Sequence, residues 1–207
     1  MIEKIYEDKD ILVLIKPAGT QSEYSDAKNS LPRMVMEESE EKCELFTLHR
    51  LDREVTGLIV YAKTQSAASF LSREIAEGRM EKVYLAMTEG RLPEKSGTLV
   101  DLLFKDSSKN KSYVVKRERR GVKRASLEYT ELAATDLGTL YRIKLHTGRT
   151  HQIRVQFSSR GCAVAGDRKY GAKAGGEMLL SSHRLSFVHP ATKKQISFEY
   201  TPEFAKL

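Results

Sequence analysis

Short apolar runs that end at Pro, Gly or a polar residue recur along the chain and predict that strands dominate the fold. Residues 11–17 have the sequence ILVLIKP, which predicts a buried strand ended by Pro17 and Gly19. The runs GLIVYAK at 57–63 and KVYLAMTEG at 82–90 predict two more strands. None of the apolar runs approaches the ~20 residues that a membrane-spanning helix needs.

Further strands are predicted in the second half of the chain. SYVVK and RASLEYTEL flank RERRGV, which predicts a hairpin with Gly121 in its turn. TLYRIKLHT at 139–147 predicts a strand followed by Gly148. MLLSSHRLSFVHP at 178–190 and QISFEY at 195–200 predict a final pair of strands.

Two segments predict helices, and a third is compatible with either a helix or a strand. NSLPRMVMEESEEK begins with Asn29 or Ser30 as a cap and predicts a short helix. SAASFLSREIAEG predicts a helix with Ser66 as its N-cap and Gly78 as its C-terminal stop. In HQIRVQFSSRG both patterns compete, and Gly161 at its end favours a helix.

Strands therefore outnumber helices, which predicts an α+β fold around a largely antiparallel or mixed sheet. We expect residues 1–207 to form a single domain, because no stretch has the composition of a linker.

The positive charge of the chain is concentrated in one segment. Residues 105–124 hold nine Lys or Arg and two acidic residues, which accounts for the whole net charge of +7. A concentrated basic element favours a polyanionic partner, first of all a nucleic acid. The alternative is a solvated hairpin tip with no partner.

Cysteine and histidine usage gives no sign of a metal site or a disulfide framework. Cys43 and Cys162 are far apart and lack a motif, so reduced thiols in a cytoplasmic protein are expected. The five histidines have no zinc-type spacing. The polar, acidic N-terminus is unlike a secretory signal.

One carboxylate stands between two arginines, in the segment HRLDR that includes Arg50, Asp52 and Arg53. The two guanidinium groups favour the charged form of Asp52, which suits a nucleophile or an electrostatic stabiliser and makes a poor general acid. The alternative is a structural ion pair in a loop.

Two further segments carry residues that suit contact with RNA. GRTHQIR contains Arg149 and Arg154, and arginine binds carboxylate or phosphate in a bidentate manner. A polar helix start would have a similar composition. Tyr84, near Lys82, is either a core residue of its strand or a platform on which a base stacks.

Six short segments and their order along the chain are more specific for a protein family than any one segment alone. YEDKDILVLIKPAGT, HRLDREVTGL, KVYLA, GRTHQIR, GDRKYG and LSFVHP follow one another along the chain. Together they resemble the RluA family of RNA pseudouridine synthases from near residue 6 to the C-terminus. The resemblance implies a mixed, mostly antiparallel bent sheet with flanking helices and a central catalytic cleft.

The resemblance also implies the reaction and its residues. A uridine inside RNA becomes pseudouridine, with no metal, nucleotide or redox cofactor. Asp52 corresponds to the family's catalytic aspartate, which either attacks the nucleoside or removes a proton from C2′. Tyr84 corresponds to the stacking tyrosine and Arg154 to the arginine that pairs with the aspartate. Arg50 corresponds to the side chain that fills the stack left by the extruded base.

The same resemblance sets expectations for the substrate. Many relatives carry a small RNA-binding domain of the S4 type before the catalytic domain, and this chain has no room for one. Loops of the catalytic domain would then select the target in ribosomal RNA, transfer RNA or both. A monomer without membrane contact is expected. The residues predicted to bind RNA are Arg50, Lys116, Arg119, Arg120, Lys123 and Arg149.

The chain departs from the family pattern at three places. Val55 and Thr56 replace Thr-Ser before Gly57, Ser181 and Ser182 replace a His-Ala pair, and Gln156 replaces a frequent His. These departures put substrate contacts in doubt without changing the reaction class.

Two other functions remain open from the residues. The first is a non-catalytic RNA-binding or ribosome-assembly factor on the same fold, although such a factor would have no chemical need for Asp52. The second is a hydrolase or lyase with Asp52 as its nucleophile, which no obvious general acid–base pattern supports.

Overall fold

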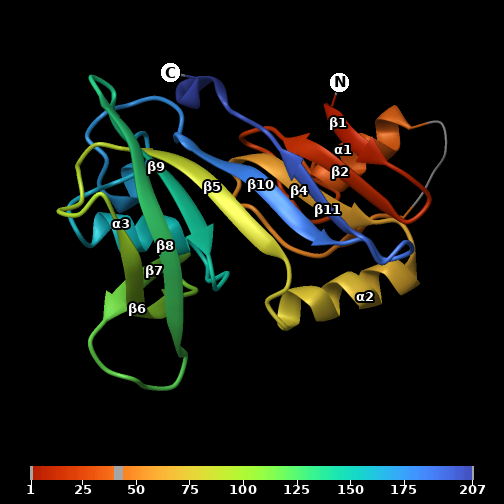
Figure 1. The fold of residues 1–207 in the computed structure, drawn as a ribbon, viewed down its shortest axis with the longest axis horizontal. Coiled ribbons are helices and arrows are strands. Elements are labelled where there is room, and N and C mark those ends of the chain that lie inside the picture. Colours follow the sequence, from red (N-terminus) through yellow and green to blue (C-terminus); the bar gives the residue numbers. More distant parts are fainter. Residues whose placement is uncertain (1, 40–43, 207) are drawn as a thin grey trace. The chain divides into compact units, whose positions relative to one another are not determined.

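The computed structural model describes residues 2–39 and 44–206, which form two compact units. Unit 1 lies within residues 1–82 and 181–202. Unit 2 lies within residues 83–180 and 203–207. Figure 1 shows the elements of both units in the colours of the sequence.

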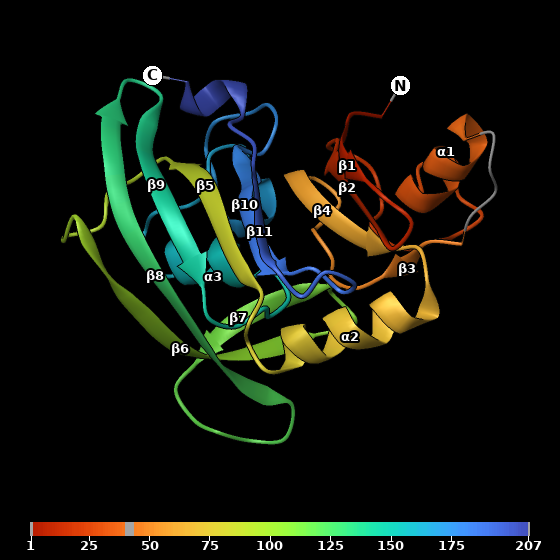
Figure 2. The same ribbon diagram turned by 45° about the vertical axis from the view of Figure 1, so that its right-hand side comes forward.

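Unit 1 contains a mixed sheet with the strand order β1-β2-β4-β10 (Figure 2). The β4–β10 pair is parallel, and the β1–β2 and β2–β4 pairs are antiparallel. Two short additions are also antiparallel, since β11 pairs with β10 and β3 pairs with β4. The strands are β1 (Lys4–Glu7), β2 (Ile11–Lys16), β3 (Phe46–Thr47), β4 (Thr56–Ala62), β10 (Leu180–Val188) and β11 (Gln195–Glu199).

The core of unit 1 forms where the central strands meet α2 (Gln65–Ala76). All six residues of β2 are buried, as its continuous apolar run predicts. The buried cluster contains Ile11, Val13, Ile15, Leu58, Val60, Leu71, Met80, Leu185 and Phe187. A helix of this length is stabilised mainly by packing its apolar face against such a cluster.

The ends of the two helices of unit 1 refine the sequence prediction. Thr64 caps α2, because its backbone is extended and its hydroxyl accepts a hydrogen bond from the Ala67 amide at 3.2 Å. The prediction of Ser66 as the cap was wrong, since Ser66 is already inside the helix. Gly78, with φ of +72°, follows the helix end as expected. The helix α1 (Leu31–Glu38) follows Ser30.

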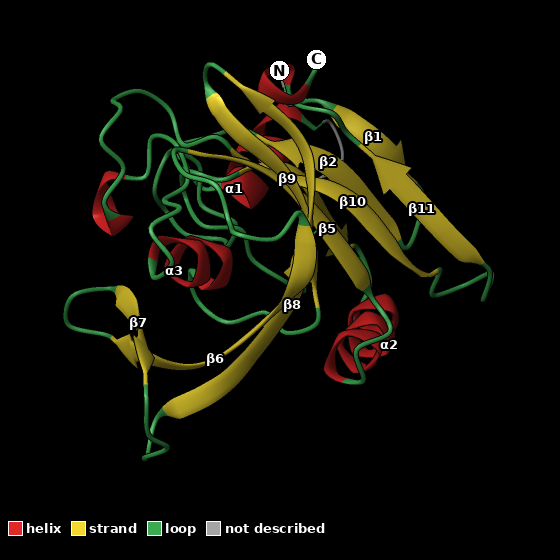
Figure 3. Cartoon of the chain, turned by 60° about the vertical axis from the view of Figure 1, so that its left-hand side comes forward, coloured by secondary structure: helices red, strands yellow, loops and turns green. Residues whose placement is uncertain are grey.

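Unit 2 contains a set of paired strands and an α-helix (Figure 3). Its strand order is β5-β9-β8-β6-β7. The strands are β5 (Glu81–Thr88), β6 (Ser96–Asp106), β7 (Lys111–Val115), β8 (Val122–Thr135) and β9 (Gly138–Leu145). The helix α3 (Gln152–Ser158) and the 3₁₀ turns η1 (Arg168–Tyr170) and η2 (Glu203–Ala205) complete the unit.

The predicted hairpin around Gly121 was wrong. The strands β7 and β8 both pair with β6 and lie on its two sides, so that Leu102 of β6 pairs with Val115 on one side and Arg124 on the other. Residues 116–121 therefore form a loop that connects two non-adjacent strands. Nine of the eleven residues of β6 are exposed or partly exposed, so this segment lacks the apolar pattern from which a strand is predicted.

The predicted fold class is correct, and the structure decides the segment for which helix and strand patterns competed. The α+β class with a mixed, mostly antiparallel sheet is confirmed, and the open segment HQIRVQFSSRG forms the helix α3. Cys162 is a buried free thiol whose pKa is raised by burial. Cys43 and the end of the predicted segment 29–42 lie outside the described residues. No described helix has the length and apolar character needed to cross a membrane.

The cap of α2 gives a direct test of this part of the fold. Replacing Thr64 by Ala removes the acceptor for the Ala67 amide and should lower the free energy of unfolding by about 1 kcal/mol. Urea denaturation of Thr64→Ala and of the control Ser66→Ala measures the difference. An equal loss in both variants would contradict the assignment of Thr64 as the cap.

Candidate active site

Asp52 occupies a tight turn in unit 1, immediately before β4. The Val55 amide donates to the Asp52 carbonyl at 3.0 Å, and the Gly19 amide donates to the Arg53 carbonyl at 2.8 Å. Leu51 and Val55 on either side are buried, while Asp52 itself is partly exposed. The turn therefore holds a carboxylate at the protein surface on a rigid backbone.

Lys16 supports this turn from inside the protein, which the sequence analysis did not predict. Its side chain has an exposure of 0%. The Lys16 ammonium donates to the Arg53 carbonyl at 2.9 Å and to the Pro17 carbonyl at 3.0 Å. Burial lowers the pKa of Lys16 to about 8, and the negative charges of Glu54 and Asp52 oppose this shift. The sequence feature that could have indicated this role is a lysine at the end of an otherwise apolar strand.

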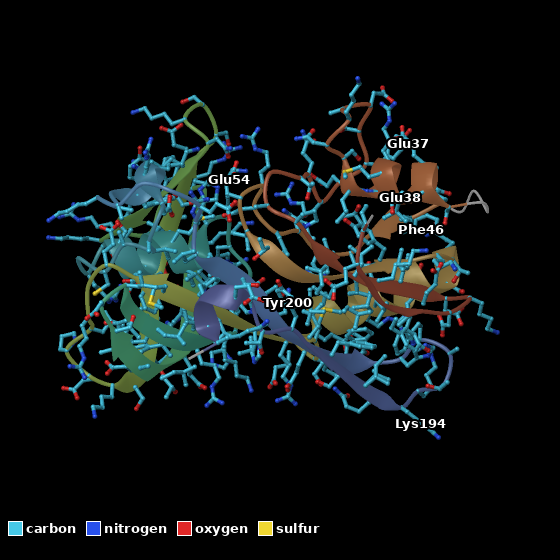
Figure 4. All side chains as sticks on the ribbon, turned by 90° about the horizontal axis from the view of Figure 1, so that it is seen from above. Glu37, Glu38, Phe46, Glu54, Lys194 and Tyr200 are labelled. Atoms are coloured by element: carbon cyan, nitrogen blue, oxygen red, sulfur yellow. The ribbon has the colours of Figure 1, made fainter. Side chains whose placement is uncertain are left out.

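The arginines beside Asp52 in sequence make their ion pairs elsewhere. Arg50 pairs with Glu23 at 2.9 Å, and both side chains are more than half exposed. Arg53 pairs with Glu54, a residue labelled in Figure 4, also at 2.9 Å. Both arginines therefore have acidic partners besides Asp52. Their expected effect on the charge of Asp52 stays a prediction.

His49 is a structural residue of the same loop. Its Nε2 accepts a hydrogen bond from the Val60 amide at 3.2 Å, so the ring replaces a strand partner for β4. Its Nδ1 is buried and has no hydrogen-bond partner among the described residues. Burial, together with the charge of Lys82, lowers the pKa of His49 to about 3. A ring held neutral in this way does not serve as an acid at neutral pH.

Tyr84 lies in β5, in the part of that strand that belongs to unit 2. The residue is 7% exposed. Lys82, two positions earlier, has its pKa lowered by burial. The stacking role of Tyr84 stays a prediction.

Arg154 lies in α3 and forms a buried ion pair with Asp167. Its Nε donates to Oδ2 of Asp167 at 2.6 Å, and its Nη2 donates to Oδ1 at 2.8 Å. The side chains are 8% and 1% exposed, respectively. Sequence reasoning did not predict Asp167 as a partner, although GDRKYG was among the segments that carry the resemblance. The implied pairing of Arg154 with Asp52 stays a prediction.

The segment before α3 is fixed by hydrogen bonds of Gln152. Its Oε1 accepts from the Thr147 hydroxyl at 2.7 Å and from the Arg149 amide at 3.0 Å. Its Nε2 donates to the Ser126 carbonyl of β8 at 3.1 Å. These bonds attach GRTHQIR to β8 and set the direction from which α3 starts.

The basic segment 105–124 belongs entirely to unit 2 and is solvated. The predicted RNA-binding side chains Lys116, Arg119, Arg120 and Lys123 are all exposed. Two other basic residues attach to this segment. Arg149 donates to the Arg124 carbonyl at 3.0 Å, and Lys169 donates to the Asn110 carbonyl at 3.1 Å.

Ser181 and Ser182 lie at the parallel contact of β10 with β4. Gly57 has φ of +104°, and a Cβ on it would be 2.3 Å from the Ser182 carbonyl oxygen. Both serines are buried, and their hydroxyl groups lack a hydrogen-bond partner within the described part of the chain. The departure from the family pattern at these positions therefore concerns the packing inside unit 1.

The described residues contain no group of three or more His, Cys, Asp or Glu positioned to hold a metal ion.

Comparisons with known proteins agree with the resemblance in the sequence. A family model described as RNA pseudouridylate synthase matches residues 10–159. An uncharacterized RNA pseudouridine synthase of Aquifex aeolicus is 33% identical, and the match covers 96% of this chain and 68% of that protein. Ribosomal large subunit pseudouridine synthase D of Zymomonas mobilis is 30% identical with the same coverages.

A solved structure shows the same fold. Human RNA pseudouridylate synthase domain containing 1 has a TM-score of 0.81 and 23% identity, covering 99% of this chain and 84% of that one. The chain spans about two thirds of the length of the curated relatives it matches, from 59% for the Borreliella burgdorferi protein to 71% for one of the Bacillus subtilis proteins.

The buried His49 predicts a specific sensitivity to acid. Its pKa of about 3 lies below the ordinary value of 6.5, so the unfolded chain binds a proton in this interval and the folded chain does not. The free energy of unfolding should therefore fall as the pH falls from 6.5 to about 3, with a contribution of about 1.4 kcal/mol per pH unit from His49.

Replacing His49 by Gln should remove this contribution and flatten the decline. Chemical denaturation at a series of pH values gives the slopes, with His146→Gln as the control because His146 is exposed. If both variants keep the wild-type slope, His49 is protonated in the folded protein.

Proposed function

This chain belongs to the family of RNA pseudouridine synthases, and from that premise we propose that it isomerises specific uridines in ribosomal or transfer RNA by means of Asp52. The observation that carries the proposal is the Asp52 turn, a partly exposed carboxylate on a backbone that Lys16 and Gly19 hold in place. The single catalytic domain 1–207 is part of the proposal, and the family model spans residues of both units in support of it.

The reaction breaks the N1–C1′ bond of uridine, turns the uracil, and joins C5 to C1′. The proton on C5 leaves and N1 gains a proton, so the overall change is an isomerisation without a redox step. Asp52 either adds to the nucleoside or removes the C2′ proton, and both roles need a charged carboxylate.

A uridine in folded RNA is stacked, and its extrusion costs roughly a few kcal/mol. Arg50 is suited to fill the gap that the extruded base leaves. Its exposed ion pair with Glu23 contributes only about 0–1 kcal/mol, so the Arg50 side chain can leave Glu23 and stack on a neighbouring base at little cost. We assign to Tyr84 the π-face on which the extruded uracil stacks. Arg154 supplies a fixed positive charge to the reacting centre.

The basic segment 105–124 supplies the attraction for RNA in this proposal. Eight of its nine Lys and Arg residues are exposed, and Lys111 is partly exposed. Such a surface suits contacts to phosphate groups that do not depend on the RNA sequence. The names of the Zymomonas mobilis and Borreliella burgdorferi relatives, ribosomal large subunit pseudouridine synthase D, support a ribosomal substrate. The enzyme is proposed to act as a cytoplasmic monomer without a metal or nucleotide cofactor.

Replacing Asp52 by Asn tests the catalytic assignment. The amide keeps the shape and can act neither as nucleophile nor as base, so pseudouridine formation should fall below detection while RNA affinity is retained. The assay is tritium release from RNA labelled at uracil C5, on protein shown to be folded by its thermal transition.

Asp26→Asn is the matched control, because Asp26 is an exposed acid of the same unit. If folded Asp52→Asn turns over RNA at a rate near that of the control, Asp52 is not catalytic, and the alternative of a structural ion pair is favoured. Normal RNA binding by a wild-type protein that shows no tritium release would favour the RNA-binding or assembly factor.

Replacing Lys116, Arg119 and Lys123 by Gln tests the RNA-binding surface. Each lost phosphate contact should lower the slope of log K against log[salt] by about 0.7–0.9, so three contacts lower it by about 2 to 3. Filter binding at several salt concentrations measures the slope.

A control triple variant separates this effect from a change in net charge. Lys28, Lys95 and Lys194 are exposed and lie outside the basic segment, and their replacement by Gln should leave the slope nearly unchanged. Equal slopes in the two triple variants would mean that residues 105–124 do not contact the RNA.

A further inference from the structure

The pairing of Arg154 with Asp167 fixes more than a charge. Two parallel hydrogen bonds, from Nε to Oδ2 and from Nη2 to Oδ1, hold the guanidinium group and the carboxylate in one plane. The third nitrogen, Nη1, is not part of this pair, and its direction is set once the plane is fixed. Asp167 therefore determines where Arg154 directs its other N–H groups.

Asp167 is itself held on a rigid backbone. Its amide donates to the Val164 carbonyl at 3.0 Å, and its carbonyl accepts from the amides of Tyr170 and Ala172 at 3.1 Å each. The preceding Gly166 has φ of +79°, and a Cβ there would be 2.1 Å from the Glu177 carbonyl oxygen. No other residue fits at Gly166 without moving this backbone.

Tyr170 supports the same guanidinium through its ring. The Cζ atom of Arg154 is 5.0 Å from the centre of the ring, within the range of a cation–π contact. The Tyr170 hydroxyl accepts from the Ser112 amide at 2.7 Å and lies 2.9 Å from Nδ1 of His151. Because Ser112 belongs to β7, this contact connects Arg154 with the basic segment.

A buried ion pair is an inefficient way to stabilise a fold. Removing both charges from water is costly, and well-packed apolar residues of the same volume are often as good or better for stability. What the pair provides is a guanidinium of fixed charge and orientation in the interior of unit 2. The arrangement therefore suits a guanidinium group whose N–H groups must point in one fixed direction.

We propose that Asp167 and Tyr170 are positioning residues for Arg154, with Asp167 fixing the plane of the guanidinium and Tyr170 bracing its face. The inference rests on the proposed function, in which Arg154 serves the isomerisation. It adds two residues that act through Arg154 and make no contact with the substrate themselves.

A double-mutant cycle on turnover tests the proposal. Asp167→Asn should lower kcat about 10- to 100-fold through misplacement of Arg154, with KM nearly unchanged because phosphate contacts determine affinity. In the background of Arg154→Lys, which lacks the planar fork, Asp167→Asn should lower kcat no further. Multiplication of the two effects would overturn the proposal, because it would show that Asp167 acts independently of Arg154.

A matched control separates orientation from stability. Asp101 pairs with Arg160, near the other end of α3, at 2.9 Å, so Asp101→Asn removes an ion pair of the same type in the same unit. The control should keep the wild-type kcat per folded molecule. If Asp167→Asn lowers the melting temperature and keeps the kcat of the control, the pair is only structural and the proposal fails.

The role of Tyr170 is separated by a conservative and a non-conservative change. Tyr170→Phe keeps the ring over Arg154 and loses the contacts of the hydroxyl, whereas Tyr170→Leu loses the ring. Turnover should decrease more in Tyr170→Leu than in Tyr170→Phe. The reverse order would remove Tyr170 from the proposal.

A spectroscopic measurement gives an answer even if the wild-type protein turns over no RNA. Nitrogen-15 NMR of the arginine side chains should show separate, slowly exchanging Nη signals for Arg154, identified by their loss in Arg154→Lys. Asp167→Asn should merge them through rotation about the Nε–Cζ bond. Merged signals in the wild-type protein would show that Arg154 is not held and would overturn the proposal independently of the enzymatic function.

Discussion

The hydrogen bond from the buried Lys16 ammonium to the Arg53 carbonyl is the interaction on which the candidate catalytic turn depends. An ammonium out of contact with water must have its protons accepted, and the carbonyls of Pro17 and Arg53 meet this need. The end of β2 is thereby tied to the turn before β4, whose strands already pair. The position of Asp52 follows from the sheet, because neither end of this connection can move without leaving a buried charge without acceptors.

Unit 2 contains a similar arrangement. Arg154 and Asp167 are both buried, and each charged group hydrogen-bonds to the other. In both units an interior cation donates its hydrogen bonds to oxygen atoms of a turn outside its own strand or helix, the Arg53 carbonyl in unit 1 and the Asp167 carboxylate in unit 2. The difference lies in the acceptor. Lys16 is held by neutral carbonyls and retains a pKa near 8, whereas Arg154 faces a full carboxylate and stays charged throughout the physiological range. The first arrangement fixes a backbone and the second fixes a side chain.

The sequence predicted the elements whose burial is continuous. The run of β2, the strand β4 and the helix that ends before Gly78 all have patterns that a local rule detects, and the order of the short segments identified the family. The rest depends on tertiary pairing. The strand β6 has a mixed surface pattern, so its place between β7 and β8 could not be predicted, and the partner of Arg154 depends on how α3 and the Asp167 turn pack. Lys16 resembled an ordinary end of a strand.

The pairing of β10 with β4 has a consequence for the order in which the chain folds during synthesis. Ser181 and Ser182 meet Thr56 and Gly57 in parallel, with the whole contiguous segment of unit 2 between them. A ribosome releases residues 83–180 before most of β10, so the strands of unit 2 can form first. Until β10 is released, the backbone groups of β4 that pair with it have no strand partner. An unpaired apolar strand of this kind invites association with other chains. The nascent protein is therefore most vulnerable to aggregation late in its synthesis, when most of its sequence is already folded.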